Sequence, residues 1–108
     1  MKPGVAAKLA RALCLTRSAW LQRLRTAYQR RLIRASGYFD AEWYLTHNPD
    51  VRMSGMDAAV HYLRYGYVEG RDPSERFETV YYASVHPEAG QAELAPLVHY
   101  LLWNPNAE

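Results

Sequence analysis

Apolar residues recur at helical spacing along the first third of the chain. Over residues 5–34 they follow one another at steps of four or seven, which is the spacing of one face of an α-helix. These positions are Leu9, Leu13, Trp20, Leu24, Tyr28 and Leu32. Pro3 and Gly4 precede the stretch, and Ser36 and Gly37 follow it, with Gly37 suited to the left-handed conformation that ends many helices. The pattern predicts one long amphipathic helix.

The positions off this apolar stripe are mostly basic. Residues 1–39 contain nine Lys and Arg and no acid, whereas residues 40–108 contain four Arg and eleven Asp and Glu. The basic residues within the predicted helix are Lys8, Arg11, Arg17, Arg23, Arg25, Arg30, Arg31 and Arg34. The net charge of +2 therefore hides a basic arm, residues 1–38, joined to an acidic body, residues 39–108.

Three interpretations of this arm are open. It could pack on the acidic body, with its arginines pairing the acids. It could lie on an anionic membrane, with Trp20 at the headgroups and the contacts made by Lys8, Arg11, Arg17, Arg23, Arg30 and Arg31. It could bind nucleic-acid phosphates, which we disfavour because no known motif accompanies the charge and the acidic body would repel a polyanion. A cleaved transit peptide has the same composition.

A second pattern begins at Phe39 and returns, without a gap, at an offset of 38 residues. The matched pairs are Phe39 and Phe77, Trp43 and Tyr81, Tyr44 and Tyr82, Pro49 and Pro87, Val60 and Val98, His61 and His99, Tyr62 and Tyr100, Leu63 and Leu101, and Tyr65 and Trp103. A period of this length is typical of one supersecondary unit stacked on its neighbour. The repeat predicts two stacked units, residues 39–76 and 77–108.

Capping and turn residues divide the first copy into three short helices. The predicted helices cover residues 41–47, residues 49 to about 55, and residues 58–65. The residues that begin or end them are Asp40, Asn48, Pro49, Gly55, Asp57 and Gly66. With the long helix of the arm, this pattern predicts an all-α fold. Trp43 and Tyr81, at equivalent positions, are the expected anchors of the core.

The chain is rich in aromatic residues, with nine Tyr and three Trp. Two interpretations remain for them: they fill a thin helical core, or some of them line a groove that stacks on sugar rings. The candidates for such a groove, or for a partner surface, are Tyr62, Tyr65, Tyr67, Tyr81, Tyr82 and Trp103.

No residue pattern indicates catalysis. His61 and His99 recur at equivalent positions, and we expect each to be a structural residue bonded to a backbone carbonyl. Asp50, Asp57 and Asp72 suit caps and turns, and no Cys or His spacing indicates a metal site. We therefore expect no enzyme activity, no metal and no cofactor.

No apolar run is long enough to cross a membrane. Basic residues also interrupt every candidate signal-peptide core near the N-terminus. The single cysteine, Cys14, excludes an internal disulfide and is compatible with a reducing compartment. We expect a cytoplasmic protein, with the inner membrane surface as an alternative site of residence.

The segments FDAEWYL, NPDV, HYLRYG and EGRDP resemble a bacterial tandem repeat of similar length, FDxxWYLxxNPDV…G…HYxxxG…EGRxP. That repeat is found beside glycosyltransferase domains in large surface-polysaccharide proteins. The resemblance is close over residues 39–76, weaker over 77–103, and absent from the arm. It implies an all-α, non-catalytic interaction module in cell-envelope glycan assembly, with a glycosyltransferase or a polysaccharide as its partner. The alternative function is a peripheral membrane adaptor that acts through the basic helix.

Overall fold

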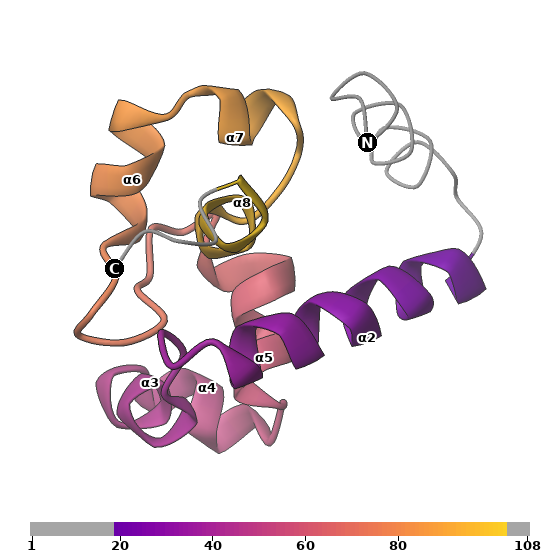
Figure 1. Cartoon of the computed structure of the whole chain (residues 1–108). Coiled ribbons are helices and arrows are strands. Elements are labelled where there is room, and N and C mark those ends of the chain that lie inside the picture. The colour runs from indigo at the N-terminus through magenta and orange to yellow at the C-terminus, as the bar shows by residue number, and fades with distance from the viewer. Residues whose placement is uncertain (1–18, 104–108) are drawn as a thin grey trace.

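The computed structural model describes residues 19–103, which fold into helices joined by short turns (Figure 1). The α-helices are α2 (Ala19–Ala35), α3 (Ala41–His47), α4 (Pro49–Ser54), α5 (Ala58–His61), α6 (Thr79–Val85), α7 (Glu88–Gln91) and α8 (Pro96–Trp103), and the π-helix η1 (Tyr62–Gly66) continues α5. No strand forms within this range, so the all-α prediction is confirmed. The N-terminal half of the predicted arm helix lies outside the described residues.

Two of the three predicted capping residues, Asp40 and Asp57, cap their helices. The third, Asn48, precedes α4 but makes no capping bond, and its side-chain amide donates to the Tyr44 carbonyl at 2.7 Å instead. The Asp40 carboxylate accepts a hydrogen bond from the Trp43 amide at 3.0 Å, and the Asp57 carboxylate accepts one from the Val60 amide at 3.0 Å. Each bond satisfies an amide that has no partner inside its helix. Gly55, with φ at 75°, ends α4 in the left-handed conformation. The predicted bounds of α3 are confirmed, and the predicted third helix corresponds to α5 and η1.

The π-helix ends at Gly66, where the backbone packs closely against Tyr44. The Tyr67 amide donates to the Tyr62 carbonyl, five residues earlier, at 3.1 Å, which widens the turn. A Cβ atom on Gly66 would lie only 2.1 Å from the Tyr44 hydroxyl oxygen. The side chain of Tyr44 therefore fits only because this position has no side chain.

Helix α2 links the two halves of the body. It runs across the molecule and packs against α5 and η1 in the first half and against α8 in the second (Figure 1). Gln29 and Ile33 are the buried residues of α2. One hydrophobic cluster extends from α2 through both halves. The largest fully buried side chains in it are Tyr44, Tyr62, Ile33, Leu97, Val51 and Val98.

The expected core anchors are displaced by one residue. Tyr81 is 65% exposed, and the buried residues are its neighbour Tyr82 and the equivalent Tyr44. Trp43 is half-buried and stacks on His47, with ring centroids 3.9 Å apart. Successive residues on a helix point about 100° apart, so a shift of one position exchanges an inward for an outward side chain. The prediction that Trp43 and Tyr81 anchor the core was wrong.

Candidate functional site

Arginines fix the inner face of α2 to the body. Arg30 donates from Nε and Nη2 to the two carboxylate oxygens of Asp57, each at 3.1 Å. Arg34 Nη1 lies 4.0 Å from the same carboxylate, and Arg25 Nη2 donates to the Glu93 carbonyl at 2.8 Å. The hydrogen bond from Arg30 holds the pKa of the Asp57 carboxyl below its usual value. Arginines of the arm thus pair with the acidic body, as the first interpretation of the arm predicted.

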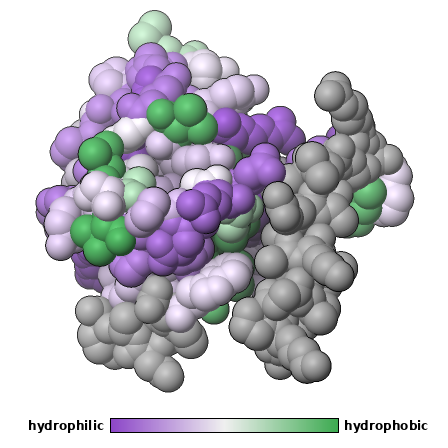
Figure 2. Space-filling model, turned by 90° about the horizontal axis from the view of Figure 1, so that it is seen from above, coloured by the Kyte–Doolittle hydropathy of each residue, from purple (hydrophilic) through white to green (hydrophobic). Residues whose placement is uncertain are grey.

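The surface of the body carries isolated hydrophobic residues. In Figure 2, which views the molecule from above, hydrophobic areas are separate patches within a largely hydrophilic surface. Single exposed apolar side chains such as Met53, Val68 and Val80 are ordinary features of a protein surface. A site requires several of them in one place.

The outer face of α2 meets that requirement. Trp20, Leu24 and Tyr28 are 60%, 58% and 59% exposed, respectively. They follow each other at steps of four, so they form a line along one side of the helix. This line is part of the apolar stripe that the sequence predicted, and it points away from the body, whereas Leu32 of the same stripe packs against the buried cluster. The body instead contacts the opposite side of α2, where Gln29 and Ile33 lie.

Positive charge accompanies the line of apolar residues. Arg23 and Arg31 are exposed and lie three residues after Trp20 and Tyr28, respectively. Helix α2 has five arginines and no acidic residue. We call Trp20, Leu24, Tyr28, Arg23 and Arg31 the outer face of α2.

The predicted membrane-contact residues fall into three groups. Trp20, Arg23 and Arg31 belong to the outer face of α2. Arg30 points to the body and binds Asp57, so it is not part of that face. The remaining residues lie outside the described range; they are Lys8, Arg11 and Arg17.

The predicted groove residues have different surroundings. Tyr62 is fully buried and its hydroxyl pairs with Thr79 Oγ1 at 3.0 Å, so its assignment to a groove was wrong. Tyr65 is half-exposed beside His61, whereas Tyr67 packs against the buried cluster. Trp103 is 45% exposed and stacks on His99, with centroids 4.8 Å apart. Each of these rings therefore packs beside a different partner.

The paired histidines are structural, with a partner that the sequence did not indicate. His61 Nδ1 lies 2.8 Å from the Tyr44 hydroxyl, and His99 Nδ1 lies 2.7 Å from the Tyr82 hydroxyl. The expected partner was a backbone carbonyl. Burial lowers the pKa of both histidines below the ordinary value, because it disfavours the charged ring.

The acidic residues of the body are engaged in caps and ion pairs. Asp50 accepts two hydrogen bonds from Arg71 at 2.9 Å, and Asp72 accepts one from the Thr79 amide at 2.9 Å. Over residues 19–103, no cluster of His, Cys, Asp and Glu could hold a metal ion. In the same range, no helix has the length and apolar character needed to cross a bilayer.

No protein-family model, curated protein or solved structure matches this chain. The resemblance to the glycosyltransferase-associated repeat therefore stays a prediction.

Proposed function

We propose that this chain is a non-catalytic interaction module that lies on an anionic membrane through the outer face of α2. The observation that carries the proposal is the orientation of this helix: it buries Gln29 and Ile33 and leaves Trp20, Leu24 and Tyr28 exposed. A helix that serves only its own protein would not leave three large apolar side chains in a line in water, because burial of apolar area is favourable.

The composition of the outer face suits a lipid headgroup layer. Trp and Tyr rings have an apolar body and a polar tip, which favours the boundary between acyl chains and water. Arg23 and Arg31 would meet anionic headgroups, and each basic residue near such a surface contributes about 1 kcal/mol. The absence of acids from α2 means that no residue of the helix opposes this attraction.

The attachment of α2 to the body gives the bound protein a defined orientation. The ion pair of Arg30 with Asp57 and the bond from Arg25 to Glu93 hold the body on the side opposite the outer face. The acidic body would therefore point away from the lipid, which reduces its repulsion by the anionic surface.

The body itself is proposed to be two copies of one helical unit, residues 39–76 and 77–108. Helix α6 starts and stops 38 residues after α3 does. The Tyr82–His99 hydrogen bond likewise joins residues 38 positions after those of the Tyr44–His61 bond. This correspondence supports the internal repeat. Taken with the resemblance of its motifs, it makes a partner in glycan assembly, either a glycosyltransferase or a polysaccharide, the second candidate for what the module binds.

Co-sedimentation with vesicles tests the membrane proposal. We expect the full chain to bind vesicles that contain phosphatidylglycerol at low salt and to be released as salt rises, because salt screens the arginine attraction. Vesicles of phosphatidylcholine alone should retain little protein. Failure to sediment with phosphatidylglycerol vesicles at low salt would contradict the proposal.

Matched variants locate the contact on α2. Trp20→Ala should weaken vesicle binding about tenfold, and Arg31→Gln about fivefold, from lost apolar burial and lost charge, respectively. Met53→Ala and Arg64→Gln, which change exposed residues elsewhere, are the controls and should leave binding unchanged. Equal losses in the controls would move the contact away from the outer face of α2.

Fluorescence of Trp20 gives an independent readout. In a variant with Trp43→Phe and Trp103→Phe, the emission should be that of a water-exposed indole without lipid, because Trp20 is largely exposed. It should shift to shorter wavelength when phosphatidylglycerol vesicles are added. Emission that does not respond to vesicles would show that Trp20 stays in water.

A further inference from the structure

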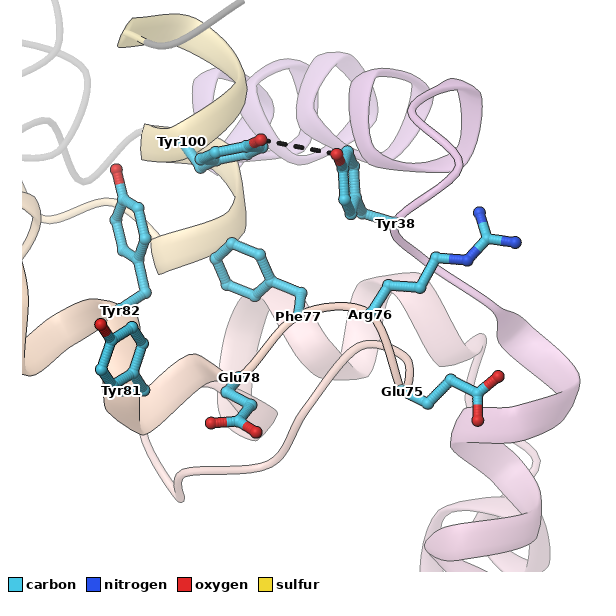
Figure 3. Close-up of a pocket in the computed structure, with 8 residues that line it drawn as sticks. All are labelled: Tyr38, Glu75, Arg76, Phe77, Glu78, Tyr81, Tyr82 and Tyr100. Atoms are coloured by element: carbon cyan, nitrogen blue, oxygen red, sulfur yellow. Dashed lines mark hydrogen bonds between the residues drawn. The ribbon is translucent and has the colours of Figure 1, made fainter. Parts of the chain in front are cut away.

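A cavity rich in aromatic side chains opens beside α6, at the junction of the two halves of the body (Figure 3). Its volume is about 380 Å³. Residues that line it include Tyr38, Phe77, Glu78, Tyr81 and Tyr100. These side chains come from the loop after α2, the turn before α6, α6 itself and α8. A cavity of this size is within the range of small-molecule sites in proteins.

The aromatic rings of the inner wall of the cavity pack against one another. The Phe77 ring lies 5.7 Å from that of Tyr100, and the Tyr38 ring lies 5.4 Å from Tyr100 at an edge-to-face angle of 80°. The Tyr38 and Tyr100 hydroxyls are 3.4 Å apart, as the dashed line in Figure 3 shows. A ligand would therefore find this wall already formed, which reduces the entropy cost of binding.

Glu78, just before α6, and Tyr81, in its first turn, lie outside the packed core of the second half. Tyr81 is 65% exposed, because Tyr82 fills the core position beside it. Glu78 precedes the helix where the first half has the capping residue Asp40, but Glu78 makes no capping bond. The amide of Thr79 is bonded by Asp72 instead. Within residues 19–103, the Glu78 carboxylate thus has no capping bond or ion pair, and it lies at the same cavity as the exposed Tyr81 ring.

This pair of groups matches the chemistry of a sugar. A sugar ring has an apolar face that can stack on an aromatic ring, and hydroxyls at its edge that donate to a carboxylate. A cation such as a quaternary ammonium needs several ring faces around one point. Here Phe77, Tyr82 and Tyr100 pack against each other, with centroids 5.3 to 5.9 Å apart, so Tyr81 presents the open face.

The local charge disfavours an acidic ligand. Glu75 and Glu78 both line the cavity. Arg76 also lines it, but its Nη1 donates to the Gly37 carbonyl at 3.1 Å, and Figure 3 shows its guanidinium directed away from the tyrosines. Among the described residues that line the cavity, no positive group is therefore aimed at a ligand carboxylate or phosphate.

We propose that this cavity binds one ring of an uncharged saccharide. The ring stacks on Tyr81, and its edge hydroxyls donate to the Glu78 carboxylate. The proposal is independent of the membrane contact, because the cavity and the outer face of α2 share no residue.

Saturation-transfer NMR with maltose, cellobiose, lactose and N,N′-diacetylchitobiose as probes tests the cavity. We expect at least one of them to receive saturation from the full chain, and tetramethylammonium to receive none. Absence of transfer to all four sugars, or transfer to tetramethylammonium alone, would overturn the proposal.

Variants of the responding protein then assign the contact. Tyr81→Ala should weaken binding of the responding sugar about tenfold, and Glu78→Gln should weaken it less, since it keeps the side-chain shape. Tyr65→Ala, at another half-exposed tyrosine, is the matched control and should bind as the unaltered chain does. Tyr81 is exposed, so its loss should leave the circular dichroism spectrum unchanged. Full retention of binding in Tyr81→Ala would place the sugar elsewhere and overturn the assignment.

Discussion

The two halves of the body pack their aromatic rings in the same way but differ in their helix caps and ion pairs. In the first half, the Phe39, Tyr44 and Tyr62 rings lie 5.8 to 6.4 Å apart; in the second, the equivalent rings lie 5.3 to 5.9 Å apart. The third ring meets the second at 88° in both halves. The aromatic packing is thus the same, although more than half of the aligned residues differ.

The helix caps and ion pairs of the two halves are different. In the first, Asp40 and Asp57 cap helices, and ion pairs join Glu42 to Arg52 and Asp50 to Arg71. In the described part of the second, the corresponding contact is a hydrogen bond between His86 Nδ1 and the Glu88 carboxylate at 3.1 Å. Helix α8 begins with Pro96, which has no amide proton to cap. The packed rings therefore specify the fold. The residues outside the ring cluster can differ and take other roles, such as those proposed for Glu78 and Tyr81.

The largest effect is expected when the contact of Gly66 with Tyr44, in the first half, is disturbed. Gly66→Ala should lower the free energy of unfolding by about 3 kcal/mol, because the new methyl group overlaps the tyrosine hydroxyl and breaks its bond to His61. Urea denaturation measures the loss. Gly90→Ala, whose methyl group would meet no atom within 4 Å, is the control and should not destabilise the protein.

The double variant Gly66→Ala with Tyr44→Phe sharpens that test. Removal of the hydroxyl leaves Cζ, at 3.3 Å, as the nearest atom of residue 44. The double variant should therefore be more stable than Gly66→Ala alone. Additive losses would show that the glycine is needed for the π-helix rather than for the tyrosine.

The Tyr–His bonds of the two halves can be compared directly. Tyr44→Phe and Tyr82→Phe should each lower the free energy of unfolding by about 1–2 kcal/mol, because each leaves a histidine nitrogen without its hydrogen bond. Similar losses in urea denaturation are expected if the halves are equivalent. A loss in only one of the variants would show that the two bonds contribute differently.

Acid should destabilise the fold through the same histidines. The pKa of His61 and of His99 is lowered in the folded protein from the ordinary 6.5, so the unfolded chain binds protons first. Stability is then complete above pH 6.5 and decreases as the pH falls through the folded values. Urea midpoints between pH 7.5 and 5 check this dependence, and the variant His61→Gln with His99→Gln should flatten it. A midpoint that rises toward pH 5 would contradict the assignment.

The smallest expected effect concerns the turn before the third helix of each half. Glu93 has φ at 57° where the first half has Gly55 at 75°. Glu93→Gly should stabilise the protein by about 0.5 kcal/mol, because glycine adopts this conformation without strain. Gly55→Ala should destabilise it by about 1 kcal/mol. Thermal unfolding of the two variants checks the opposite signs.

Much of the body could be predicted because its signals are local. Asp40 and Asp57 mark helix starts by bonds to amides three residues later, Pro49 marks one by its fixed backbone angle, and the repeat identified the equivalent ring positions. The choice of Trp43 over Tyr44 as the core anchor failed, because both are aromatic and the direction of each depends on how α3 lies on its neighbours. The cavity was missed because Tyr38 and Tyr100 are distant in sequence and meet only in the folded chain.

The sequence also did not indicate which side of α2 contacts the body. The apolar stripe was clear from the sequence, but periodicity states only that Trp20, Leu24 and Tyr28 share a side. Which side meets the body is decided by partners such as Asp57 and the Glu93 carbonyl, which bind Arg30 and Arg25. Long-range polar contacts of this kind leave no signal in the spacing of residues.

The position of α2 across both halves has a consequence for how the protein unfolds. A linear array of repeats can lose an end unit while its neighbours stay folded. Here α2 contacts α5 and α8, and Tyr62 bonds to Thr79, so neither half can open without exposing surface of the other. The chain should therefore unfold as a single cooperative unit, with the slowest hydrogen exchange shared by α5, α8 and the C-terminal part of α2.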